Sequence, residues 1–307
     1  MKIADCHMRV IFQLLLVACL WSTGGVLIKM VEWNSLAICF VRSLVTLLFL
    51  LLFRRGKRLR LTKNSIACAL SYAGVAITFV VGNKLTASAN VIFLQYIAPI
   101  YVALYTIFVL KERPRPFDVV CILLTLGGMA LFFVGEFNGG QLAGNLMGFL
   151  CGISFAAMAI FSTKNEGSML DSVLLGSIAI CIVTLPWAVG GVLKTPPSGQ
   201  SVFWLLVSAV VQYAVPYILY AGVIQLATPL EAVLIPSLEP ILNPVWVAIF
   251  LHEIPGKWAI MGGCIVLISV TAKCISAVKN TAPFPNDAGL RELQARETKE
   301  EQPAYEK

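Results

Sequence analysis

The segment "SLEPILNPVWVAIFLHE", Ser237 to Glu253, lies inside a long apolar run but contains two carboxylates and two prolines. An apolar run of about 20 residues is long enough to cross a lipid bilayer as a helix. A carboxylate near the middle of such a helix costs about 3 kcal/mol or more unless it is paired, protonated or hydrated. The segment therefore predicts a membrane helix whose polar groups face either a partner or a cavity.

The composition of the whole chain agrees with a membrane location. Hydrophobic side chains make up 58% of the 307 residues and charged side chains only 13%, with a mean hydropathy of +0.84. This is too apolar for a soluble globular protein. Apolar runs bounded by charged or turn residues predict an all-α polytopic membrane protein with ten spans. The spans are expected at residues 10–31, 34–53, 64–82, 87–110, 117–134, 142–162, 171–190, 201–220, 228–251 and 257–279.

The basic residues behind the net charge of +7 indicate an orientation in the membrane. The largest cluster, "RRGKRLRLTK" from Arg54 to Lys63, separates the second and third spans. The positive-inside rule predicts that this loop is cytoplasmic. Both termini are then expected in the cytoplasm, in a multi-pass protein of the plasma membrane, which is the inner membrane in a bacterium. Nucleic acid is not an expected partner, because no basic surface with interleaved aromatic residues lies outside this loop.

Residues typical of enzymes and metal sites are sparse. The nine cysteines are scattered singly, and the two histidines, His7 and His252, are far apart in the chain. The sequence has no metal-ligand spacing, phosphate-binding glycine loop or nucleophile-base pattern. We therefore predict no catalytic residues, no metal and no cofactor. The stretch from Lys2 to Cys19 also has features of a signal sequence, but we interpret it as part of the first span.

An internal repeat divides the ten spans into two groups of five. A shift of 141 residues places "QYIAPIYVALYTIFVLKERP", Gln95 to Pro114, on the stretch that contains the opening segment. The shift aligns Pro99 with Pro240, Leu110 with Leu251, Glu112 with Glu253 and Pro114 with Pro255. The repeats are predicted at residues 10–134 and 142–279, followed by a disordered cytoplasmic tail at 280–307. An odd number of spans per repeat predicts two inverted repeats, which are typical of secondary transporters.

Several motifs together resemble a known family. They are Arg42 in "FVRSLV", a proline midway along spans four and nine, and a carboxylate before a proline in "KERPRPF" and "HEIPGKW". In a ten-span chain this combination resembles the EamA branch of the drug/metabolite transporter superfamily, over residues 10–279. The resemblance implies a ten-helix transporter of small metabolites, often an exporter, with a central cavity lined by both halves. It implies no particular substrate.

Glu239 and Arg42 are the charged residues expected deep in the membrane. Glu239 lies about eleven residues, or about 16 Å, into the ninth span, and Arg42 lies at a similar depth in the second. One interpretation is a buried ion pair that holds these two spans together. The other is that Glu239 faces the cavity and binds a cationic group of the substrate or a proton. Glu112 and Glu253, at the ends of their spans, are instead expected to cap the following helices.

Other polar and aromatic residues at membrane depth complete the candidate site. Asn243 lies one turn beyond Glu239, while Pro240 and Pro244 free backbone carbonyls by removing helical hydrogen bonds. An aromatic stripe in the eighth span suits either packing or a cavity wall. The predicted substrate-binding residues are Glu239, Asn243, Arg42, Trp21, Ser22, Gln95, Tyr96, Gln212, Tyr213 and Tyr217. Gly144, Gly148 and Gly152 predict close packing of two helices.

The sequence thus predicts a secondary transporter that exports a small metabolite by alternating access. Amino acids, related compounds and drug-like solutes all fit the prediction, and the alternative is a membrane receptor or scaffold without transport. The expected partners are the substrate and the lipid bilayer, and a homo-oligomer stays open. A lone carboxylate at the midplane favours a proton over sodium as the coupling ion. Movement without coupling is an equally open alternative.

Overall fold

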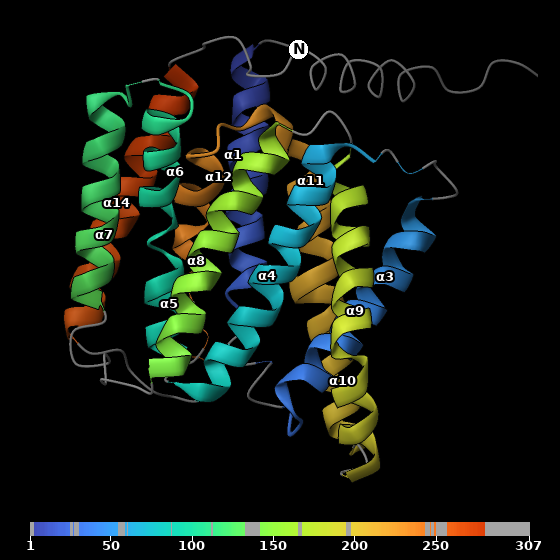
Figure 1. Ribbon diagram of the computed structural model, residues 1–307. Coiled ribbons are helices and arrows are strands. Elements are labelled where there is room, and N and C mark those ends of the chain that lie inside the picture. Colours follow the sequence, from blue (N-terminus) through green and yellow to red (C-terminus); the bar gives the residue numbers. More distant parts are fainter. Residues whose placement is uncertain are drawn as a thin grey trace, which may run out of the picture.

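Helices form all the secondary structure of the described part of the chain in this computed structural model (Figure 1). The described residues are 3–24, 27, 31–54, 59, 61–86, 88–111, 113–132, 142–164, 168–194, 198–242, 246, 249 and 257–279. Asn243, Glu112, Glu253, most of the basic loop and the predicted tail lie outside these residues.

The first half of the chain forms helices α1 to α7. They are α1 (Ile3–Trp21), α3 (Ser35–Arg54), α4 (Lys63–Leu85), α5 (Ser88–Gln95), α6 (Ala98–Phe108) and α7 (Pro116–Phe132). The predicted fourth span is interrupted between α5 and α6, where Pro99 lies in the first turn of α6. Proline is tolerated in a first turn because the backbone N–H there has no helical partner. The break places Tyr96 between two helices.

The second half has three departures from α-helical geometry. Its elements are α8 (Leu142–Thr163), α9 (Met169–Lys194), α10 (Gly199–Val207), the π-helix η1 (Ser208–Ala214), α11 (Val215–Val223), the 3-10 helix η2 (Ile224–Leu226), α12 (Glu231–Leu234), the 3-10 helix η3 (Ile235–Leu238) and α14 (Lys257–Lys279). The π-helix ends where α11 begins, and Pro216 lies in the first turn of α11. Single π turns widen a helix locally and are frequent at functional sites.

Five helical segments of the described chain are long and apolar enough to cross a membrane. They are Ser35–Leu52, Lys63–Leu85, Leu142–Thr163, Met169–Gly191 and Gly199–Leu226. Four shorter apolar helices, at His7–Trp21, Ala98–Phe108, Pro116–Leu131 and Ile260–Ser276, lie in other predicted spans. The ninth predicted span is described only in part. Leu52, Phe108 and Leu142 are each more than 70% exposed, as expected for side chains that face lipid. Together with the long apolar helices, this exposure shows that the chain is a multi-pass membrane protein.

The helices pack in a pattern that links the two halves. Helix α4 packs on α8 and α9, and α5 packs on α8; α1 packs on α11 and η3, and α3 packs on η1. Two further pairs, α3 with α9 and α7 with α14, each join a helix to its predicted repeat mate in the other half. When each predicted span is replaced by its mate in the other repeat, every pair in this set becomes a pair of the same set. For example, the pair α4 and α8 becomes the pair α11 and α1. Figure 1 shows α7 and α14 together at one side of the bundle.

The glycines of α8 allow α5 to approach closely, as the small-residue stripe predicts. A Cβ atom at Gly152 would lie 2.7 Å from the carbonyl oxygen of Leu94, and one at Gly148 would lie 3.0 Å from the Cα of Val91. Only glycine leaves room for these backbone contacts. The contact positions Gln95 and Tyr96, which follow Leu94, near the centre of the bundle.

A buried ion cluster also joins the halves. Lys273 of α14 has its Nζ 2.8 Å from Asp118 Oδ1 of α7 and 3.9 Å from Glu231 Oε1 of α12. Glu231 additionally accepts a hydrogen bond of 2.9 Å from the backbone N–H of Thr228, which caps the short helix α12. The cluster connects two helices of the second half to one of the first.

Candidate functional site

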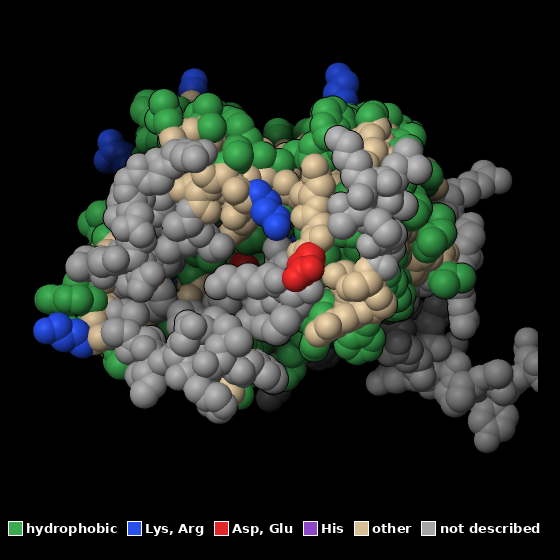
Figure 2. Space-filling view, turned by 90° about the horizontal axis from the view of Figure 1, so that it is seen from below, with side chains coloured by type: hydrophobic (Ala, Val, Ile, Leu, Met, Phe, Trp, Pro, Cys, Tyr) green, Lys and Arg blue, Asp and Glu red, His purple; other side chains and the backbone are tan. Residues whose placement is uncertain are grey.

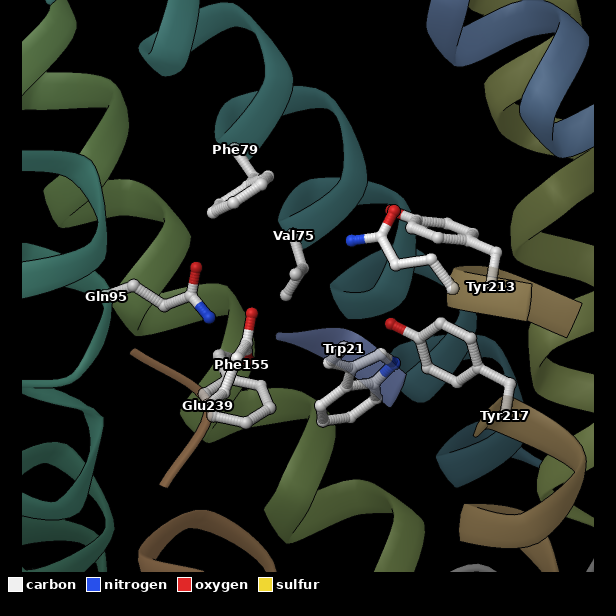
Figure 3. A pocket seen from close by; sticks show the side chains of 9 residues that line it. Trp21, Val75, Phe79, Gln95, Phe155, Tyr213, Tyr217 and Glu239 are labelled. Carbon is white, nitrogen blue, oxygen red and sulfur yellow. The ribbon is translucent and has the colours of Figure 1, made fainter. Parts of the chain in front are cut away.

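A cavity of about 40 Å³ lies between helices of both halves (Figure 3). Its walls are formed by Trp21, Val75, Phe79, Gln95, Phe155, Gln212, Tyr213, Tyr217 and Glu239. This volume holds a few water molecules at most. Figure 2 views the end of the bundle that lies at the bottom of Figure 1, and it shows a hollow near the centre with an acidic side chain visible in its depth. The polar groups of the cavity therefore lie in a small space between the helices of the two halves.

Glu239 is held by Tyr96. The hydroxyl oxygen of Tyr96 lies 2.6 Å from Glu239 Oε2 and 3.0 Å from the backbone carbonyl oxygen of Pro236. Pro240 has no N–H to donate to the carbonyl four residues earlier, which is that of Pro236. The carbonyl freed by Pro240 thus has a polar partner from the first half of the chain.

This geometry suits both protonation states of Glu239. Tyr96 has one hydroxyl proton and two acceptors within hydrogen-bonding distance. When Glu239 is ionised, the Tyr96 hydroxyl can donate to the carboxylate. When Glu239 is protonated, the carboxyl group can donate to the Tyr96 oxygen, and Tyr96 can donate to the Pro236 carbonyl. The arrangement can therefore bind and release a proton without leaving Glu239 unpaired.

Arg42 pairs with Gln212, and the interpretation of an Arg42–Glu239 ion pair is wrong for this structure. The Arg42 Nη2 group donates to Gln212 Oε1, and its guanidinium carbon lies 4.0 Å from the centre of the Tyr213 ring. The physical reason lies in the packing: α3, which carries Arg42, packs on α9 and η1, whereas η3, next to Glu239, packs on α1. Tyr96 satisfies Glu239 instead.

The Gln212 amide is positioned from three sides. In addition to Arg42, its Oε1 accepts a hydrogen bond of 3.2 Å from Ser208 Oγ, one turn earlier in the π-helix. A Cβ atom at Gly24 would overlap the amide nitrogen. The absence of a side chain at Gly24 therefore leaves room for the Gln212 amide.

Aromatic rings form much of the cavity wall. The ring of Tyr217 lies 4.8 Å from that of Tyr72 in an edge contact at 87°, and 5.4 Å from that of Trp21. Trp21 also contacts Phe155 at 6.2 Å. Such pairs stabilise the packing, and the ring faces can also attract a cation. The stripe predicted in the eighth span therefore both packs and faces the cavity.

The structure brings most of the predicted site residues together. Six of them line the cavity: Trp21, Gln95, Gln212, Tyr213, Tyr217 and Glu239. Tyr96 and Arg42 bind two of these lining residues. Ser22 instead donates to the Cys19 carbonyl at 2.6 Å and accepts a hydrogen bond of 2.7 Å from Trp246 Nε1. Asn243 lies outside the described residues.

Three lining residues are absent from the sequence prediction. Val75 and Phe79 lie one turn apart on α4, and Phe155 lies on α8. Both helices are apolar on all sides, so no periodicity distinguishes a cavity-facing valine or phenylalanine from one that faces lipid. The spacing of Phe155, three residues after Gly152 on the tightly packed part of α8, is the one available signal.

Comparisons with known proteins agree with this architecture. The profile of the EamA-like transporter family matches residues 8–134 and 142–272. The fold resembles 29 solved chains. One of them, a crystal structure with 14% sequence identity, covers 88% of this chain and 98% of its own chain with a TM-score of 0.71. No curated protein matches the sequence.

Proposed function

Because the chain belongs to the EamA-like transporter family, we propose that it is a secondary transporter that exports a small metabolite across the plasma membrane by alternating access. The observation that carries the proposal is Glu239, an acidic residue in a cavity lined by both halves of the chain. Its described hydrogen-bond partner is a neutral tyrosine rather than a cation. A carboxylate without a charged partner in a membrane protein favours a functional role.

The chemistry of the cavity suits a solute with a cationic group. Glu239 can pair with an ammonium group, and the faces of Trp21, Tyr213 and Tyr217 can attract the same positive charge. Gln95 offers an amide beside Glu239, on the same side of the cavity (Figure 3). Amino acids and related amines are therefore the solutes that we expect to bind.

The size of the cavity supports alternating access. Ligand sites commonly have volumes of about 300–1,000 Å³, whereas this cavity has about 40 Å³. A metabolite needs a different arrangement of the helices to enter. The exchange symmetry of the helix pairs supports two inverted five-helix repeats at residues 10–134 and 142–279, which can offer related openings to either side. We therefore propose ten membrane spans.

The orientation follows from charge. Helix α4, which begins at Lys63, and helix α7, which follows Arg115, both begin at the end of the bundle at which α1 begins, the upper end in Figure 1. The positive-inside rule favours the cytoplasm for this end. Both termini would then be cytoplasmic, and the hollow face of Figure 2 would face outward.

Efflux from reconstituted vesicles tests the proposal. Vesicles that contain the protein are loaded with a cell metabolite extract, and the solutes that leave are identified by mass spectrometry. We expect one or a few small amines to leave at least about ten times faster than from loaded vesicles that lack the protein. Glu239→Gln should abolish this efflux, while Glu32→Gln, at an exposed position, should preserve it. If no solute leaves faster than from loaded vesicles that lack the protein, a receptor or scaffold role replaces the proposal.

A further inference from the structure

Arg42 is a buried cation that has no anionic partner in the described part of the chain. Arg42 is only 2% exposed, and within the described residues its Nε and Nη1 groups have no hydrogen-bond partner. Gln212, which binds Nη2, is neutral. The titratable side chains near Arg42 include Cys39, Tyr72 and Tyr213. Thiols and phenols are ordinarily neutral at pH 7.

Such an arrangement leaves part of the binding capacity of the guanidinium unused. Arginine stays charged in proteins, so burial cannot be relieved by loss of its proton. The Gln212 amide and the face of Tyr213 compensate part of the cost of burial. A carboxylate would compensate more, because hydrogen bonds between charged groups are about twice as strong as those between neutral groups.

The free donors have a geometry that suits a carboxylate. A guanidinium can donate two parallel hydrogen bonds along either of two edges. One edge is formed by Nε and Nη2, and the other by Nη1 and Nη2. Gln212 Oε1 occupies one acceptor position at Nη2, and among the described residues no acceptor pairs with Nε or Nη1, the second donor of each edge. The amide oxygen therefore fills half of a carboxylate site.

The site is next to the cavity and across it from Glu239. Gln212 and Tyr213 both line the cavity, and Arg42 contacts both of them. Figure 3 shows Tyr213 and Tyr217 on one side of the cavity, with Gln95 and Glu239 on the other. Displacement of Gln212 Oε1 would free the Nη2 donor of Arg42 beside the cavity. Gln212 lies in a π-helix, a rare geometry that is frequent at functional sites.

We propose that Arg42 receives an anionic group of the transported solute, a carboxylate in its simplest form, and that Gln212 Oε1 occupies this position when the site is empty. The identity of the bound group as part of a solute rests on the proposed transport function. A solute with charges of both signs would bridge the cavity from Arg42 to Glu239.

The first test uses formate, the smallest carboxylate, with neutral formamide as its matched control. The purified full-length protein is heated in detergent with each compound at up to 100 mM and constant ionic strength. Formate should raise Tm saturably by about 3 °C, the shift expected when a ligand is present at about ten times its Kd. Formamide should not raise Tm. The absence of a formate effect, or an equal effect of formamide, would overturn the proposal.

The second test places a carboxylate permanently beside Arg42. Gln212→Glu keeps the size of the side chain and provides the missing anion, so this variant should have a higher Tm than the natural protein and should not respond to formate. Gln95→Glu makes the same change on the opposite side of the cavity, next to Glu239, and should lower Tm. The proposal requires both results. A decrease in Tm for Gln212→Glu, or a remaining response to formate, would disprove it.

These tests do not depend on transport. If formate binds but no solute leaves loaded vesicles, the proposed transport function fails while the anion site stands. If a solute is transported but formate has no effect on Tm, the anion site fails while transport stands.

Discussion

The hydroxyl oxygen of Tyr96 lies 2.6 Å from a carboxylate oxygen of Glu239, although the two residues are 143 positions apart in the chain. The contact joins the break between α5 and α6 in the first half to the proline-containing segment that follows η3 in the second. Because Tyr96 also reaches the Pro236 carbonyl, at 3.0 Å, one hydroxyl group connects the protonation of Glu239 to the backbone of that span.

Removal of this hydroxyl should impair transport. Tyr96→Phe deletes the donor to Glu239, and hydrogen bonds to charged groups contribute about 1.5–3 kcal/mol. We expect the efflux rate of the solute identified in vesicles to fall by about tenfold or more. Tyr105→Phe is the matched control, because the Tyr105 hydroxyl accepts from Lys164 at 2.9 Å and does not line the cavity. Equal rates for Tyr96→Phe and the natural protein would show that the contact has no role in transport.

Proton coupling gives a second prediction. The two hydrogen-bonding arrangements around Tyr96 allow Glu239 to be either charged or neutral, so a pH gradient should drive solute movement. With equal solute concentrations on both sides, an imposed pH difference should cause solute to accumulate on the side that has the higher proton concentration, because export exchanges an entering proton for a leaving solute. Downhill flux that continues without any accumulation, in either orientation of the gradient, would identify uncoupled movement instead.

The proposed orientation is tested with reporter fusions. Ten spans and a cytoplasmic basic loop place residues Lys63 and Glu136 on opposite sides of the membrane. A fusion after Lys63 should be active only with a cytoplasmic reporter, and a fusion after Glu136 only with an external reporter. Signals from one side for both fusions would require a different number of spans between them.

The close contact between α8 and α5 predicts a specific stability change. Gly152→Ala would place a methyl group 2.7 Å from the Leu94 carbonyl oxygen, and overpacking of this kind costs about 1–3 kcal/mol. We expect a lower Tm in detergent. Gly127→Ala in α7 is the matched control, because its Cβ would have no neighbour within 4 Å in the described chain. It should leave Tm unchanged or slightly raised, and a similar decrease for both variants would contradict the packing argument.

The buried ion cluster provides the fifth prediction. Lys273→Met would leave Asp118 and Glu231 as neighbouring carboxylates without the lysine that they share. Loss of one partner of a buried ion pair costs about 3–5 kcal/mol, so the yield of folded protein and its Tm should both fall. Lys257→Met removes a lysine from an exposed position in the same helix and should change Tm little. The cluster has no structural role if the two variants are equally stable.

The amino-acid sequence alone predicts the helical membrane architecture. Apolar run length and flanking charge are local properties, and the depth of a residue such as Glu239 follows from counting along its helix. Six of the ten predicted site residues line the cavity, and the reason is their depth in the membrane. Polar residues at membrane depth face protein or water rather than lipid, so the sequence is sufficient to select them as candidates for the cavity wall. Their roles in substrate binding stay predictions.

The tertiary structure decided which residues meet. Counting along two helices places Arg42 and Glu239 at similar depth, but it says nothing about the face that each helix presents or about its neighbours. Close packing at Gly152 and the break at Pro99 bring Tyr96 to Glu239, and the packing of α3 on η1 brings Arg42 to Gln212. The apolar lining residues Val75, Phe79 and Phe155 became recognisable only in the same way, because a side chain that faces lipid and one that faces a cavity can be chemically identical.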